Sequence, residues 1–118
     1  MLIYISGFHE AIEDDRLIRQ QFDQVQLRYC QLGYEVINPA SKVYRESQKQ
    51  ASVQMNVVGD LTITKKVTYC RATRILQGLA SIIVADKVLF LSNGTFSEQA
   101  RIEREFCNAI AKDFEIIP

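Results

Sequence analysis

Short apolar runs alternate with longer amphipathic stretches along the chain. Four of the runs are rich in branched or aromatic side chains, are bounded by polar or turn residues, and have the length of buried β-strands. The first ends at Ser6-Gly7 and the second at Asn38-Pro39. We therefore expect strands over Leu2–Ile5, Tyr34–Ile37, Lys87–Leu91 and Phe114–Ile117.

The stretches between the strands carry apolar residues at helical spacing. The first predicted helix, Ile12–Leu32, has a single apolar stripe, and Gly33 follows it where a left-handed cap would stand. That stripe consists of Ile18, Phe22, Val25, Tyr29 and Leu32.

The second predicted helix runs from about Thr64 to Val84. Its expected core face opposes a polar face that holds Arg71, Arg74, Gly78 and Ser81, and the two arginines are expected to be solvated. The core face consists of Ala72, Ile75, Leu76, Leu79, Ile82 and Ile83.

The third predicted helix, about Phe96 to Lys112, contains one anomaly. Glu103 lies seven residues after Phe96, in the middle of the apolar sector, and is the only charged residue there. A buried carboxylate is unfavourable unless it is paired or hydrogen-bonded, so it belongs either to a structural network or to a reactive site. The apolar sector also contains Ala100, Ile102, Phe106, Cys107, Ala109 and Ile110, and the solvent side Glu98, Arg101, Glu105, Asn108 and Lys112.

The alternation of strands and helices predicts a three-layer, flavodoxin-like α/β fold with about four parallel strands in the order 2-1-3-4. Residues 1–118 are expected to form a single domain. The segment Ala40–Asp60 breaks the pattern, being polar and then mildly apolar. It is interpreted as a flap, a helix or a segment docked on a partner subunit.

Composition narrows the function. The chain has 14 basic and 14 acidic residues, which argues against binding of polymeric nucleic acid or acidic membranes. No apolar stretch is long enough to span a bilayer, and the start resembles a strand rather than a signal peptide. The three cysteines lack metal-ligand spacing, so we expect reduced thiols, a cytoplasmic location and no metal or cofactor.

The predicted topology brings the carboxyl ends of the first and third strands together. Open parallel sheets bind ligands in this crevice. It would place Tyr4, Ser6 and Gly7, followed by Phe8 and His9, near Glu103. A lone carboxylate in an apolar pocket is suited to attack on an electron-poor carbon such as an anomeric centre. The sequence offers His9 no partner at a recognisable spacing, and Asp86 is expected to cap the entry of the third strand.

Three motifs carry a resemblance that covers the whole chain. The opening IYISG, the GYEVINPA of residues 33–40 and the segment from Ala85-Asp86 to Glu103 are similar to a family of short bacterial and phage proteins. That family is related to the nucleoside 2-deoxyribosyltransferases. Its pattern runs YISGP, GxxVxNPA and then SxGAxxE.

The resemblance implies roles for individual residues. Glu103 takes the place of the carboxylate that attacks the sugar, and Tyr4 that of the tyrosine that orients it. Ser97 matches a serine that contacts phosphate in the related nucleoside monophosphate hydrolases. The implied substrate is a nucleoside or nucleoside 5-monophosphate, handled by a homo-oligomer. Ser6, Gly7, Phe8, Ser97 and Gln99 are the expected substrate contacts.

Departures from the pattern keep other functions open. Phe8 replaces the proline after Gly7, Gln99 replaces a glycine, and Gly78 stands where the transferases carry an acidic residue. A second register, which starts at Gly94 and ends at Glu98, is disfavoured because Glu98 falls on the solvent side of the helix. The alternatives are a non-catalytic module that binds a nucleotide derivative and a purely structural assembly unit.

Overall fold

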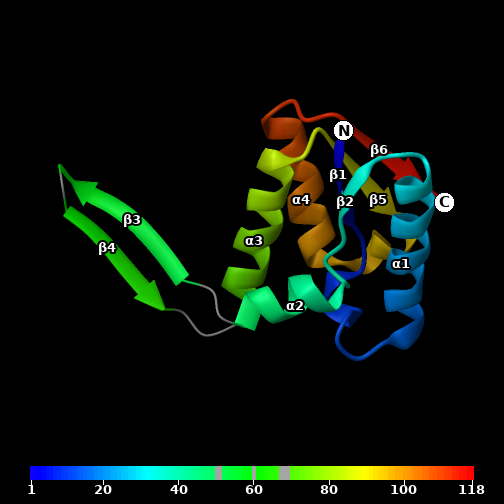
Figure 1. Ribbon diagram of the computed structural model, residues 1–118, viewed down its shortest axis with the longest axis horizontal. Coiled ribbons are helices and arrows are strands. Elements are labelled where there is room, and N and C mark those ends of the chain that lie inside the picture. Colours follow the sequence, from blue (N-terminus) through cyan, green and yellow to red (C-terminus); the bar gives the residue numbers. More distant parts are fainter. Residues whose placement is uncertain (50–51, 60, 67–69) are drawn as a thin grey trace.

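The structure is a computed structural model and describes residues 1–49, 52–59, 61–66 and 70–118. Four parallel strands form its central sheet in the order β2-β1-β5-β6 (Figure 1). Tyr4 pairs with Ile37 on one side and with Val88 on the other. The predicted order and the three-layer α/β class are confirmed. The strands are β1 (Leu2–Ser6), β2 (Glu35–Ile37), β5 (Lys87–Leu91) and β6 (Phe114–Ile117).

Helices cover both faces of this sheet (Figure 1). The alternation of side chains along β1 divides the core in two. Ile3 and Ile5 pack with Phe22 of α1, whereas Tyr4 packs on the opposite face with Cys107 of α4. Tyr4 therefore faces the helix that carries Glu103. The helices are α1 (Arg16–Gln31), α2 (Lys42–Lys49), α3 (Arg71–Val84) and α4 (Glu98–Ala109), with two short 3-10 helices, η1 (His9–Ala11) and η2 (Ser92–Phe96).

Helix α1 begins four residues later than predicted. Asp15 is its N-cap and accepts hydrogen bonds from the backbone N–H groups of Leu17 (2.9 Å) and Ile18 (3.3 Å). A helix begins after its N-cap residue, whose backbone angles are not helical. Ile12, three residues before Asp15, therefore lies outside the helix. Gly33 follows the C-terminus with a φ of +91°, as expected of a left-handed cap.

The segment before α3 differs most from the prediction. Residues 42–49 form α2, one of the three alternatives considered, and an antiparallel hairpin follows. The expected helical start at Thr64 was wrong, because residues 64–66 belong to the second hairpin strand. Leu61–Lys66 alternates apolar and polar residues and is rich in β-branched side chains, which favours a strand. Residues 50–51 and 60 of the segment Ala40–Asp60, and residues 67–69 of the predicted helix, lie outside the described residues.

The hairpin extends away from the α/β body (Figure 1). It consists of β3 (Ser52–Val58) and β4 (Leu61–Lys66), which pair with a register irregularity near their connection. Gly59, in that connection, has a φ of +54°.

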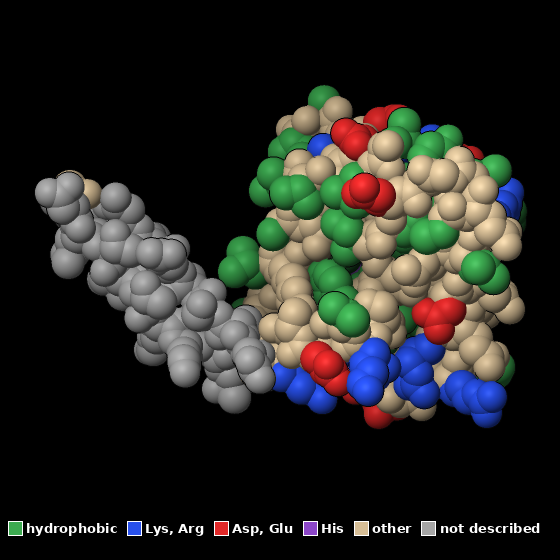
Figure 2. Space-filling view, in the orientation of Figure 1, with side chains coloured by type: hydrophobic (Ala, Val, Ile, Leu, Met, Phe, Trp, Pro, Cys, Tyr) green, Lys and Arg blue, Asp and Glu red, His purple; other side chains and the backbone are tan. Residues whose placement is uncertain are grey.

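The buried face of α3 agrees only in part with the apolar pattern, which placed Ile82 in the core but Gly78 and Ser81 on the solvent side. Gly78, Ser81 and Ile82 are buried, whereas Leu76 and Ile83 of the expected core face are 53% and 60% exposed. Apolar side chains lie on the surface over α3 (Figure 2). The helix turns its small residues inward, which allows it to approach α4 closely.

Helix α4 begins after the predicted start. Phe96 ends η2, is 88% exposed and lies outside the apolar stripe, which corrects its expected place in the core. Ser97 is the N-cap and accepts a hydrogen bond from the backbone N–H of Ala100 at 3.0 Å. The inward direction of Glu103 is confirmed, since its side chain is fully buried.

Two smaller features complete the fold. Asp86 accepts a hydrogen bond at 2.8 Å from the backbone N–H of Leu2, so it ties the entries of β1 and β5 together as expected. No helix among the described residues is long and apolar enough to cross a membrane.

Candidate active site

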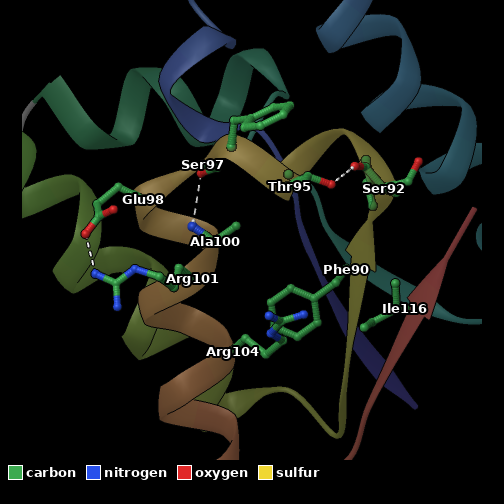
Figure 3. A pocket seen from close by; sticks show the side chains of 12 residues that line it. Phe90, Ser92, Thr95, Ser97, Glu98, Ala100, Arg101, Arg104 and Ile116 are labelled. Carbon is green, nitrogen blue, oxygen red and sulfur yellow. Dashed lines mark hydrogen bonds and ion pairs between the residues drawn. The ribbon is translucent and has the colours of Figure 1, made fainter.

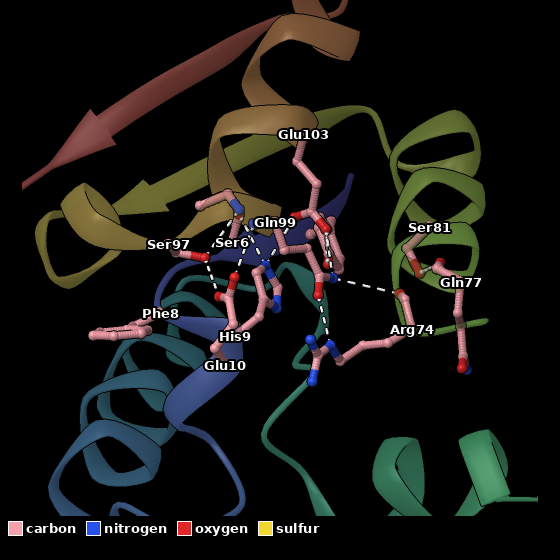
Figure 4. A network of polar contacts seen from close by, with 12 residues as sticks. Ser6, Phe8, His9, Glu10, Arg74, Gln77, Ser81, Ser97, Gln99 and Glu103 are labelled. Carbon is pink, nitrogen blue, oxygen red and sulfur yellow. Dashed lines mark hydrogen bonds and ion pairs between the residues drawn. The ribbon is translucent and has the colours of Figure 1, made fainter. Parts of the chain in front are cut away.

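Both carboxylate oxygens of Glu103 are engaged in hydrogen bonds (Figure 4). Oε2 accepts from the Tyr4 hydroxyl at 3.1 Å and from the side-chain amide of Gln99 at 3.0 Å. Oε1 lies 2.9 Å from Nε2 of His9. These contacts satisfy a carboxylate that burial would otherwise make costly.

The fold explains why these groups meet. Tyr4 and Ser6 point to the same side of β1, and η1 follows directly and carries His9 back beneath α4. Ser6 Oγ lies 3.1 Å from the same His9 nitrogen that contacts Glu103. The cluster stands at the carboxyl end of β1 beside β5, where the strand order reverses and where ligands of such sheets bind.

The sequence interpretation placed His9 near Glu103 but identified no partner for it. It is buried, and Glu103 and Ser6 are its partners, although no spacing in the sequence suggested either. The available signal was weak. A histidine three residues beyond a strand-end serine can return to that serine only if the intervening residues form a tight turn, and η1 supplies this turn.

Burial and hydrogen bonding act in opposite directions on the acid. Burial alone would raise the pKa of Glu103, but the charge and hydrogen bond of His9, with hydrogen bonds from Gln99 and Ser6, hold that pKa below its ordinary value. Burial raises the pKa of Tyr4 well above its ordinary value, and the Glu103 charge adds to this effect. The site therefore holds an ionised carboxylate beside a protonated phenol.

Gly78 fixes how closely α3 approaches the acid. A Cβ atom placed on Gly78 would lie 2.2 Å from Glu103 Oε2 and 3.1 Å from the Tyr4 hydroxyl. No side chain can occupy this position without displacing the carboxylate. Close packing therefore leaves no room here for the acidic residue that the resemblance described above would place at this position.

Gln99 closes the site from the solvent side. Its amide donates to Glu103, while its Oε1 accepts from Nε of Arg74 at 2.9 Å. The expectation that Arg74 lies on a solvated face was therefore wrong. Beyond Gln99 and His9 lies a hollow of only about 10 Å³, bordered also by Tyr44 of α2. That volume is about the room that one water molecule needs.

A second carboxylate occupies the N-terminus of α4. Glu10 accepts a hydrogen bond from the Ser97 hydroxyl and another, at 3.0 Å, from the backbone N–H of Gln99. Burial opposes ionisation of Glu10, but these two donors outweigh it and lower its pKa. Ser97, the expected phosphate contact, is thus engaged by the protein's own anion, and sequence analysis did not identify Glu10.

Gly7 and Phe8 contact a different part of the chain. Phe8 N–H donates to Oδ1 of Asn93 at 2.9 Å, and a Cβ on Gly7 would lie 2.7 Å from that oxygen. The Phe8 ring points away from Glu103 (Figure 4). The structure therefore unites Tyr4, Ser6 and Gln99 with Glu103 but places Gly7 and Phe8 against the η2 turn.

The competing register places its acid outside the site. Glu98 is exposed and pairs with Arg101 on the same helix, as its place on the solvent side predicted. No group of three or more His, Cys, Asp or Glu residues within the described ranges has the arrangement of a metal site. No protein-family model, curated protein or solved structure matches this chain.

Proposed function

We propose that this protein cleaves the N-glycosidic bond of a nucleoside or nucleoside 5-monophosphate, with Glu103 as the nucleophile. The observation that carries the proposal is the buried, ionised Glu103 carboxylate held between Tyr4 and His9 at the switch point of the sheet. Perturbed carboxylates of this kind concentrate in functional sites. The resemblance to the nucleoside 2-deoxyribosyltransferase family supports the same assignment.

The chemistry requires two displacements at the anomeric carbon. Glu103 attacks that carbon, and the base leaves with the bonding electron pair and takes up a proton. The resulting glycosyl ester is then attacked by water, which gives hydrolysis, or by another base, which gives transfer. Tyr4 donates to the attacking carboxylate and orients it, and His9 keeps it ionised before attack.

Substrate access requires Gln99 to move. Its amide caps Glu103 on the side of the small hollow next to α2. If Gln99 and Arg74 separate from Glu103 together, that hollow opens directly onto the carboxylate. A 5-phosphate would then reach the N-terminus of α4, where it would compete with Glu10 for Ser97.

The test measures free base by chromatography after incubation with a panel of deoxynucleosides and their monophosphates. We expect base release by the wild-type protein and none by Glu103→Gln, which retains the size of the side chain. Glu105→Gln is the matched control, because Glu105 lies on the exposed side of the same helix. Release of base by Glu103→Gln at the wild-type rate, or no release by the wild type, would refute the role of Glu103 as nucleophile.

A second candidate is a non-catalytic module that binds a nucleotide derivative. The observation that favours it is the saturation of Glu103, because each of its oxygens already has a partner and no cavity large enough for a sugar adjoins it in the described part of the protein. A thermal-shift screen distinguishes the two. Stabilisation by nucleotides without base release supports binding alone, and absence of both favours a structural role.

We also propose that the protein acts as a homo-oligomer in the cytoplasm. Leu76, Ile83 and Val84 leave an apolar strip exposed on α3, and a second copy is the partner that we assign to it. Light scattering after size exclusion tests this directly. A mass equal to one chain at micromolar concentration would overturn it.

A further inference from the structure

A second cavity lies on the other side of α4 from the Glu103 cluster. Its volume is about 300 Å³, and it opens between η2, α4 and the carboxyl end of β6. Pockets that bind small molecules begin at about this size. Buried Phe90, Leu91 and Ala100 are among its lining residues, and Ile116 of β6 borders it. None of Tyr4, His9 and Glu103 borders it, although Ser97 at the N-terminus of α4 does.

Two arginines border this cavity, but only one is available to a ligand. Arg101 is paired on its own helix with Glu98 and, at 2.9 Å, with Glu105. The side chain of Arg104 has no hydrogen bond or ion pair with any residue in the described ranges. It borders the cavity together with Phe90 (Figure 3). The cavity thus combines apolar side chains, the hydroxyl groups of Ser92, Thr95 and Ser97, and one cation that forms no ion pair with a described residue.

We propose that this cavity binds a small organic anion with a flat apolar body, such as an aromatic carboxylate or aryl phosphate. The guanidinium of Arg104 would take the anionic group, since its planar fork matches both carboxylate and phosphate oxygens. Phe90 and Ile116 would contact the apolar body. The cavity shares Ser97 with the phosphate contact proposed above but no charged group with the Glu103 cluster, so this proposal does not depend on the chemistry assigned to Glu103.

The test follows amide and arginine side-chain NMR signals of the full ¹⁵N-labelled chain during titration with four probes. Benzoate and phenyl phosphate carry both features, acetate carries only the charge, and benzamide only the ring. We expect saturable shifts at Gly94, Thr95 and Arg104 with the first two probes. Acetate and benzamide should bind about tenfold more weakly or worse, because each lacks one half of the recognition. The better of the two aromatic anions identifies the preferred anionic group.

A matched pair of substitutions tests which arginine binds the anionic group. Arg104→Gln should weaken benzoate and phenyl phosphate binding about tenfold, and Arg101→Gln less than about twofold, because Arg101 is already neutralised. Arg104→Lys keeps the charge and should retain part of the affinity. Equal losses from the two Gln variants, equal binding of all four probes, or shifts that map outside the cavity would overturn the proposal. Shifts at Arg104 on raising protein concentration alone would also overturn it by showing that another copy fills the cavity.

Discussion

The two sides of α4 present opposite solutions to the placement of charge. On one side, Glu103 is fully buried and each of its oxygens has a polar partner. On the other side, Arg104 stands exposed at the cavity of about 300 Å³, and its side chain has no ion-pair or hydrogen-bond partner among the described residues. The cluster of reactive polar groups and the cavity with room for a ligand therefore lie on different sides of α4. The sealed side has the groups that chemistry needs, and the open side has the room that a ligand needs.

The closest packing of the sealed side gives the largest expected effect. Gly78→Ala should destabilise the protein by about 2–3 kcal/mol, because the added methyl group would overlap Glu103 Oε2. The sign is diagnostic, since alanine in place of glycine within a helix would otherwise stabilise by up to about 1 kcal/mol. Urea unfolding measures the difference. A stabilised Gly78→Ala variant would show that α3 does not press on the acid.

Acid should weaken the sealed side through Glu103. Its pKa is lower in the folded protein than the ordinary value of 4.5, so the folded state binds fewer protons than the unfolded chain in that range. Its contribution to stability is complete above the ordinary value and is lost as the pH falls through the folded-state pKa. Glu10 titrates in the same direction and contributes to the same loss.

The Glu103 part of this pH dependence can be isolated by substitution. The free energy of unfolding should fall less steeply below about pH 5 in Glu103→Gln than in the wild type. Glu105→Gln is the control, since it makes the same change on the exposed side of the same helix. Identical slopes for the wild type and Glu103→Gln would mean that the buried acid does not titrate with a lowered pKa.

Removal of the carboxylate at the N-terminus of α4 should have a smaller effect. Glu10→Ala removes two hydrogen bonds from that end of the helix and should cost about 1 kcal/mol, the usual cost of losing a helix cap. Thermal unfolding measures the loss. Glu13→Ala, a nearby carboxylate with only a long 3.8 Å contact to Arg45, should change the midpoint much less. Equal shifts of the unfolding midpoint in the two variants would show that Glu10 does not cap α4.

The open side should be nearly indifferent to loss of its cation. Arg104→Gln should change the free energy of unfolding by less than about 0.5 kcal/mol, because its exposed charge forms no ion pair with a described residue. Chemical denaturation of the wild type and the variant measures the difference. A loss above about 1 kcal/mol would show that Arg104 serves the fold rather than a ligand.

Periodicity was sufficient for the sheet and for the inward acid. Four apolar runs gave the parallel strands and their order, and the helical wheel placed Glu103 on the buried face. The meeting of Tyr4 and Ser6 with Glu103 followed from that topology. These features depend on regular spacing, which a sequence records directly.

The remaining features depend on geometry that spacing does not record. His9 and Glu10 reach α4 because η1 curls back after β1, and nothing in the apolar pattern fixes the path of such a turn. The orientation of α3 was only partly predicted because its contact with α4 uses Gly78, which has no side chain and carries little apolar weight. The hairpin was not predicted. Strand β3 lies in the segment 40–60, whose pattern favoured no single structure, and the end of β4 lies in the predicted helix.

The most direct test of the central claim uses a protein in which the sealed side is opened. Gln99→Gly removes the amide that covers Glu103, and intact-mass and peptide mass spectrometry then follow its reaction with deoxynucleosides and their monophosphates. We predict faster base release than in the wild type and a deoxyribosyl adduct on the peptide that contains Glu103, with neither product in Gln99→Gly/Glu103→Gln. A folded Gln99→Gly protein that binds nucleotides but forms no adduct and releases no base would contradict the claim.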